Sequence, residues 1–160
     1  MRGRRHTGRT KRQSDRTQAH HPQRNGGHRQ NLLYIVGIGP GALEHLSQRA
    51  AEVLRNADTI VGYTTYIELI RPLIRDKTVV STGMTQEVKR VDAAIETALS
   101  GRSCAIVSSG DPGIYAMAGL VFEMCTAKQI RVAAPPGTVE RDASQPRLTV
   151  EVIPGIPALC

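Results

Sequence analysis

The segment Leu32-Leu33-Tyr34-Ile35-Val36-Gly37-Ile38-Gly39-Pro40-Gly41-Ala42 joins a short apolar run to a glycine-rich end. An apolar run of this length, bounded by glycines, predicts a buried strand. The glycines predict a tight loop that another group can approach closely, because they carry no side chain. Ser47 follows at a position that suits the N-cap of a helix whose apolar residues keep helical spacing. A strand, a tight loop and a helix in this order form the unit from which α/β domains are built.

The same alternation continues through the chain. We expect further strands over 59–61, 77–81, 103–109, 129–134 and 148–153. The expected helices cover 66–73, then a segment that Thr85 caps and whose apolar face is Val88, Val91, Ala94, Ile95, Ala98 and Leu99, and finally 114–128. The run over 103–109 is nearly all apolar, which is typical of a strand covered on both faces. The sequence therefore predicts an α/β domain with a mostly parallel sheet flanked by helices.

The charge of the chain is unevenly distributed. The net charge is +7, but residues 1–31 hold nine of the 21 basic residues and one of the 14 acidic ones. This stretch also lacks Leu, Ile, Val and Phe, so we interpret it as a disordered basic extension with no secretory signal. An arginine-rich arm that binds nucleic acid through its phosphates is an alternative that we do not favour.

The cysteines and the apolar runs bear on the kind of protein. Cys104, Cys125 and Cys160 are widely spaced and form no C-x-x-C pair. Such a set predicts reduced thiols in a cytoplasmic protein, and no metal site. No apolar stretch reaches the roughly 20 residues that a membrane span needs, so we expect no membrane association.

The spacing of the first glycine loop allows several interpretations. The run Gly37-Ile38-Gly39-Pro40-Gly41-Ala42 matches G-x-G-x-x-(G/A), and Asp58 follows at about the distance of 20 residues seen in Rossmann dinucleotide sites. Against that hypothesis, Pro40 has no amide hydrogen, and the expected helix begins several residues after the glycines. A loop approached by a ligand without phosphate groups is one alternative. A tight turn that binds nothing is the other.

A second glycine loop, Ser108-Ser109-Gly110-Asp111-Pro112-Gly113-Ile114-Tyr115, follows the most apolar of the expected strands. Open α/β sheets bind ligands at the carboxyl ends of their strands. Either Asp111 caps the next helix, or the backbone of this loop holds a small ligand with amine and carboxylate ends. The serines do not form G-x-S-x-G, and we interpret His45, the only histidine beyond residue 31, as a polar loop residue. A hydrolase is therefore not expected.

Three motifs occur in a fixed order: Val36-Gly37-Ile38-Gly39-Pro40-Gly41, then Ser109-Gly110-Asp111-Pro112, then Val152-Ile153-Pro154-Gly155-Ile156. In this order they resemble the tetrapyrrole methylase family, whose members use S-adenosylmethionine. The resemblance covers residues 32–160. The segments 61–67, 81–87 and 108–119 resemble the precorrin-3B C17-methyltransferase branch of that family.

The resemblance implies a tetrapyrrole methylase fold with its N-terminal domain at 32–153. Residues 154–160 then form a hinge and the start of a second α/β domain that is truncated. The family holds its cofactor between the two domains, so we expect this chain to offer part of a pocket and to show weak or no activity. The full-length protein is expected to be a homodimer.

The resemblance also implies the residues of a cofactor site, mostly through their backbone groups. The S-adenosylmethionine-binding positions are Gly37, Gly39, Pro40, Gly41, Ser109, Gly110, Asp111, Ile114, Tyr115, Pro157 and Ala158. Pro157 lacks the hydroxyl of the Thr or Ser that is common at its position, which puts that contact in doubt. No metal is implied.

The implied reaction is C-methylation of an anionic macrocycle in cobalamin biosynthesis, at C17 of precorrin-3B or cobalt-factor III, with ring contraction. Tyr63, Tyr66 and Asp111 are the candidates for acid–base chemistry, whereas we interpret Glu87 and Lys89 as solvated helix charges. The carboxylates of such a substrate should meet Arg or Lys side chains. The alternatives are a methylase for another ring position, a Rossmann-type nucleotide-binding domain with a nucleic-acid-binding extension, and an inactive remnant.

Overall fold

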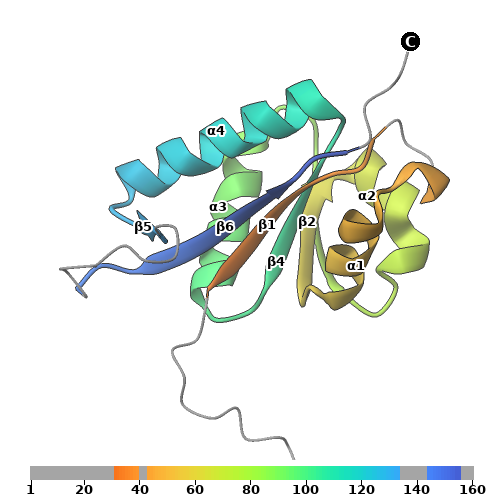
Figure 1. The fold of residues 1–160 in the computed structure, drawn as a ribbon. Coiled ribbons are helices and arrows are strands. Elements are labelled where there is room, and N and C mark those ends of the chain that lie inside the picture. The colour runs from red at the N-terminus through yellow and green to blue at the C-terminus, as the bar shows by residue number, and fades with distance from the viewer. Residues whose placement is uncertain (1–30, 40–42, 134–143, 156–160) are drawn as a thin grey trace, which may run out of the picture.

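The computed structural model describes residues 31–39, 43–133 and 144–155, with the side chains of Asp111 and Pro112 left out. Its strands are β1 (Leu32–Gly37), β2 (Thr59–Tyr63), β3 (Thr78–Thr82), β4 (Cys104–Ser108), β5 (Arg131–Val132) and β6 (Arg147–Ile153). Its α-helices are α1 (Gln48–Asn56), α2 (Thr64–Ile70), α3 (Glu87–Leu99) and α4 (Asp111–Ala127), with short 3₁₀ turns η1 (Leu43–His45) and η2 (Arg71–Leu73). Figure 1 shows how these elements form one sheet with helices on both sides.

The six strands form one sheet in the order β3-β2-β4-β1-β6-β5, and every neighbouring pair is parallel. This confirms the predicted parallel α/β sheet. The connection after β1 crosses β4 to reach β2, and the connection after β4 crosses β1 to reach β5. The helices of these two connections, α1 and α4, pack on opposite faces of the sheet, so the chain switches sides between β1 and β4. Open α/β sheets bind their ligands at such a switch point, beyond the carboxyl ends of the strands.

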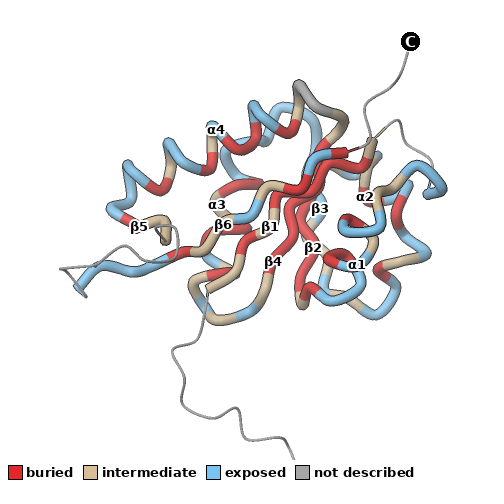
Figure 2. Tube along the Cα trace, viewed as in Figure 1, coloured by how far each residue is buried: buried red, intermediate tan, exposed pale blue. Residues whose placement is uncertain are grey.

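The sheet separates two apolar cores, and β4 contributes to both. Cys104 and Ile106 pack with α3 and α4, whereas Ala105 and Val107 pack with α1 and α2. All five residues of β4 are buried, which explains its nearly continuous apolar sequence. Figure 2 shows the buried residues concentrated in the central strands, with the outer faces of the helices exposed.

The cysteines in the described part of the chain serve as small apolar side chains. Cys104 and Cys125 are buried and form no disulfide. Burial raises the pKa of the Cys104 thiol to about 12, which keeps this thiol protonated at neutral pH. Within the described ranges, no helix is long and apolar enough to cross a membrane.

The start of α3 departs from the sequence prediction in two ways. Thr85 is not the N-cap: its φ is 66°, and Gln86 precedes the helix without a capping side-chain bond. Instead, the Gln86 side chain accepts a hydrogen bond from the Gly83 amide at 3.2 Å. Val88 was predicted to lie on the apolar face but is 60% exposed. With 3.6 residues per turn, the buried stripe that contains Ala94 continues back to residue 90 instead.

Other boundaries shift by a few residues. Helix α2 begins at Thr64 rather than at residue 66, and α4 begins at Asp111 rather than at 114. Gly110 therefore occupies the N-cap of α4, and the hypothesis that Asp111 caps this helix is wrong. Strand β5 is shorter than predicted, since Gln129 has a positive φ of 56°.

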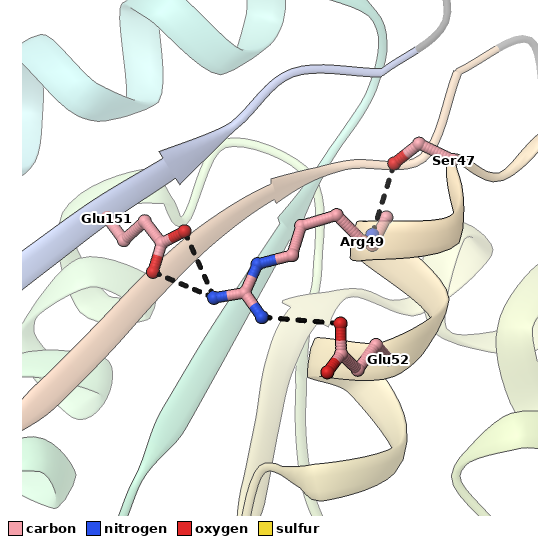
Figure 3. A network of polar contacts seen from close by, with 5 residues as sticks. Ser47, Arg49, Glu52 and Glu151 are labelled. Atoms are coloured by element: carbon pink, nitrogen blue, oxygen red, sulfur yellow. Dashed lines mark hydrogen bonds and ion pairs between the residues drawn. The ribbon is translucent and has the colours of Figure 1, made fainter.

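The N-terminus of α1 agrees with the prediction. The Ser47 hydroxyl accepts a hydrogen bond from the Ala50 amide at 3.1 Å (Figure 3). Arg49 on the same helix extends to β6, where its Nη2 lies 3.1 Å from both carboxylate oxygens of Glu151. This bond is the main cause that raises the pKa of Arg49. Because the pair is exposed, it contributes little to the stability of the fold.

We expect the substitution Gly119→Ala to stabilise the protein. Gly119 lies inside α4 on its exposed side, and a Cβ there would meet no atom within 4 Å. Glycine in a helix interior costs about 0.5–1 kcal/mol relative to alanine, so the free energy of unfolding should rise by that amount. Urea unfolding followed by circular dichroism measures the change. An unchanged or lower stability would contradict the helical environment described for Gly119.

Candidate functional site

The three sequence motifs meet at one edge of the sheet. The first follows β1, the second follows β4 and the third follows β6, and β1 lies between the other two strands. The register pairs Gly37 with Ser108 and Val36 with Ile153, so the three strands end at the same level. The Ile38 amide donates a hydrogen bond to the Ser108 carbonyl at 3.0 Å. Because the strands are parallel and adjacent, three motifs that are far apart in the sequence form one cluster of loops.

The first and third loops contact each other backbone to backbone. A Cβ on Gly37 would lie 2.6 Å from the Gly155 nitrogen, and a Cβ on Gly155 would lie 2.7 Å from the Gly39 nitrogen. Gly39 also has a positive φ of 68°, which side chains disfavour. The group that approaches the first loop closely is therefore, at least in part, the backbone of the third loop. No local sequence pattern predicts this role for Gly155.

The second loop leaves room for another molecule. A Cβ on Gly110, the N-cap of α4, would meet no atom of the described residues within 4 Å. Ile114 is fully buried one turn later, and its Cδ1 would lie 3.2 Å from a Cβ on Gly37. Tyr115, by contrast, is 61% exposed. Gly110 thus borders open space, while Ile114 packs against the first loop from the core.

A cavity of about 330 Å³ opens beside the second loop. This volume lies within the range of small-molecule sites. Its walls come from the end of β4 and from three helices. The lining residues are Tyr66, Glu87, Arg90, Val107, Ser108, Ser109, Gly113, Ala116, Met117 and Leu120.

Two of the predicted catalytic candidates lie together next to this cavity. The rings of Tyr63 and Tyr66 meet edge to face, with centroids 5.3 Å apart. The Arg90 guanidinium carbon lies 6.0 Å from the Tyr63 ring centroid. Asp111 is the first residue of α4, at the same edge of the sheet. Glu87 lines the cavity but is exposed, and Lys89 is exposed as well, in agreement with their interpretation as solvated charges.

Arg90 is the residue that the sequence analysis missed. It is 5% exposed, and among the described residues it is the only charged side chain that is buried. The signal was its place in the helix: residue 90 continues the stripe of Val91, Ala94 and Ala98 by one turn. Charged residues at helix starts are usually solvated, so the burial of Arg90 was not predicted.

The arrangement argues against a Rossmann dinucleotide site. Asp58 lies before β2, at the opposite edge of the sheet, where its Oδ2 accepts hydrogen bonds from the amide and hydroxyl of Ser103. It therefore cannot reach a ribose at the glycine loops. The first α-helix begins only at Gln48, so its amides do not face the Gly37–Gly39 turn as the dinucleotide motif requires.

Some predicted site residues lie outside the described residues, namely Pro40, Gly41, Pro157 and Ala158. Their part in the site stays a prediction. In the described part of the chain, no group of three or more His, Cys, Asp or Glu side chains is placed to hold a metal ion.

Comparison with known proteins finds relatives that are named as methyltransferases of cobalt-factor III. A cobalt-factor III methyltransferase of Priestia megaterium is 42% identical over 127 residues, which cover 79% of this chain and 21% of that protein. A probable cobalt-factor III C(17)-methyltransferase of Salmonella typhimurium is 45% identical over 101 residues, which cover 63% of this chain and 42% of that protein. The chain spans less than half the length of these curated relatives.

The fold is similar to part of a solved methyltransferase, CobJ. That crystal structure superposes with a TM-score of 0.59 and 31% sequence identity, over 79% of this chain and 47% of CobJ. The sequence profile of the tetrapyrrole (corrin/porphyrin) methylases matches residues 32–160, the whole range over which the motifs were found. The chain belongs to the tetrapyrrole methylase family.

Proposed function

We propose that this chain is the N-terminal part of an S-adenosylmethionine-dependent methyltransferase that acts on C17 of precorrin-3B or cobalt-factor III, with ring contraction, in cobalamin biosynthesis. The observation that carries the proposal is the meeting of three glycine loops at the switch point of the sheet. The relatives named as cobalt-factor III methyltransferases support the choice of substrate. We further propose a cytoplasmic protein that forms a homodimer as part of the full-length enzyme.

The geometry at the second loop fits a cofactor that is held mainly by backbone groups. Among the described residues, no atom lies within 4 Å of the place that a Cβ on Gly110 would occupy, so the described chain leaves room beside this loop. When bound there, S-adenosylmethionine would supply its sulfonium methyl group to an electron-rich carbon of the substrate and leave as S-adenosylhomocysteine. Residues such as Ile114 fix the loops in place from the core. Positioning of this kind accounts for much of the rate gain in reactions between two bound molecules.

The test is binding of S-adenosylhomocysteine to the purified full-length protein that contains this chain, measured by isothermal titration calorimetry. We expect the wild type to bind and Gly110→Trp to lose at least about 100-fold in affinity, since the indole would fill the space beside the loop. The φ of Gly110 is −56°, which a tryptophan adopts without strain. Circular dichroism should therefore show a folded variant.

A matched control is Gly119→Trp, which places the same side chain on the same helix, also where a Cβ has room. This variant should bind S-adenosylhomocysteine like the wild type. A wild-type protein that binds NAD and not S-adenosylhomocysteine would refute the proposal in favour of a nucleotide-binding domain. Equal losses in both tryptophan variants would show that the effect is not local to the second loop.

A further inference from the structure

Arg90 carries a buried charge that has no counter-ion among the described residues. Its Nε donates to the Thr82 hydroxyl at 2.8 Å and its Nη2 donates to the Gly83 carbonyl at 3.1 Å. A guanidinium has five N–H donors, so three of them have no partner among the described residues. None of the ion pairs in this part of the chain includes Arg90. None of the Arg90 nitrogens is both fully buried and without a hydrogen-bond partner, so the unpaired N–H groups are open to solvent, and Arg90 lines the cavity. A ligand anion in the cavity can therefore reach them.

The cavity beside Arg90 has a second buried polar side chain. Ser108 is 4% exposed and lines the same cavity, and no hydrogen bond to its hydroxyl occurs within the described residues. Gly113 keeps this wall open, since a Cβ there would lie 3.1 Å from the Ser108 hydroxyl and 2.4 Å from that of Ser109. Two buried groups with unused hydrogen-bonding capacity therefore face one cavity.

Tyr63 fixes the orientation of the guanidinium. The arginine carbon lies 6.0 Å from the centroid of the Tyr63 ring, and Tyr66 packs against that ring and lines the cavity. A planar guanidinium held by a ring and by two acceptors presents its remaining N–H groups in a fixed direction. Such a fork suits the two oxygens of a carboxylate.

We propose that Arg90 binds a carboxylate of the tetrapyrrole substrate in this cavity, with Ser108 as a second hydrogen-bonding group. The proposal rests on the proposed function, because the polycarboxylate macrocycle is the substrate class assigned there. Arg90 is then a residue that determines substrate affinity rather than a catalytic acid or base. The exposed carboxylate of Glu87 at the same cavity lies in a more polar environment, so it opposes a bound anion less than Arg90 attracts one.

The test uses uroporphyrin III, a stable porphyrin with eight carboxylates, as the probe. Quenching of its fluorescence on titration with protein gives a dissociation constant for the wild type. Arg90→Met should raise this constant about 10-fold to 100-fold, the range expected when a hydrogen-bonded ion pair is lost. Arg90→Lys keeps the charge without the fork, so its loss should be smaller. The control Arg55→Met removes an exposed arginine of α1, on the other face of the sheet, and should change nothing.

Binding of S-adenosylhomocysteine and thermal unfolding separate the possible outcomes. Arg90→Met should keep both, since an apolar side chain of similar length replaces a buried charge. If Arg90→Met fails to fold, the comparison of Arg90→Lys with the wild type decides alone. Unchanged porphyrin affinity overturns the proposal, as does a loss of S-adenosylhomocysteine affinity in its place, which would assign Arg90 to the cofactor carboxylate. A wild type that binds neither probe refutes the proposed function itself.

Discussion

Replacing Gly37 with alanine is expected to lower the free energy of unfolding by about 3 kcal/mol, at the upper end for overpacked sites. The new methyl group would lie 2.6 Å from the Gly155 nitrogen and 3.2 Å from the Ile114 side chain. The nitrogen belongs to the backbone, which cannot rotate away as a side chain can. The third loop must therefore move away from the first, at the point where β6 pairs with β1. Urea unfolding followed by circular dichroism measures the loss.

The matched control is Gly83→Ala. A Cβ on Gly83 would have its nearest neighbour at 3.8 Å, which is ordinary van der Waals contact. We expect its effect to stay within about 0.5 kcal/mol, as for most exposed substitutions. The reciprocal variant Gly155→Ala should reproduce the loss at Gly37. If Gly37→Ala were as stable as Gly83→Ala, the two loops would not be in backbone contact.

The sequence predicted elements better than it predicted their ends. Apolar runs and helical spacing predicted every strand and α-helix that the structure describes. They do so because burial on one face of a sheet or helix produces a periodic pattern of apolar residues. Helix starts depend on a few backbone angles instead. Thr85 is a good capping residue by type, yet its φ is positive and the N-cap of α3 is the next residue, Gln86. Local composition contains no record of that angle.

The site was predicted in part, for a similar reason. The glycine motifs marked the loops, and the parallel sheet explains why they meet. The contact between Gly37 and Gly155 depends on the strand order, since β6 lies beside β1 although more than a hundred residues separate the two glycines. No local pattern encodes this order. The burial of Arg90 was not predicted either. The spacing of the helix places residue 90 on the buried side of α3, but its burial depends on the cavity wall around it.

Gly62 is the position where one added methyl group should disturb the wall of the cavity. It lies in β2, and a Cβ there would be 2.3 Å from Cγ2 of Val107 and 3.1 Å from Cδ1 of Ile67. Val107 is buried, lines the cavity and is branched at Cβ, so it has few rotamers with which to yield. We expect Gly62→Ala to lower the free energy of unfolding by about 2–3 kcal/mol, as overpacking does in rigid cores.

A double-mutant cycle tests the cause of this loss. Val107→Ala alone removes two methyl groups and should cost about 2 kcal/mol. In the double variant Gly62→Ala/Val107→Ala, the new methyl group occupies space that Val107 has vacated, so the cost should not exceed that of Val107→Ala alone. The coupling energy is then about 2 kcal/mol, far above the 0.3–0.5 kcal/mol typical of independent sites. Additive losses in urea unfolding would contradict the contact, because they would mean that Gly62 is required for a reason other than the side chain of Val107.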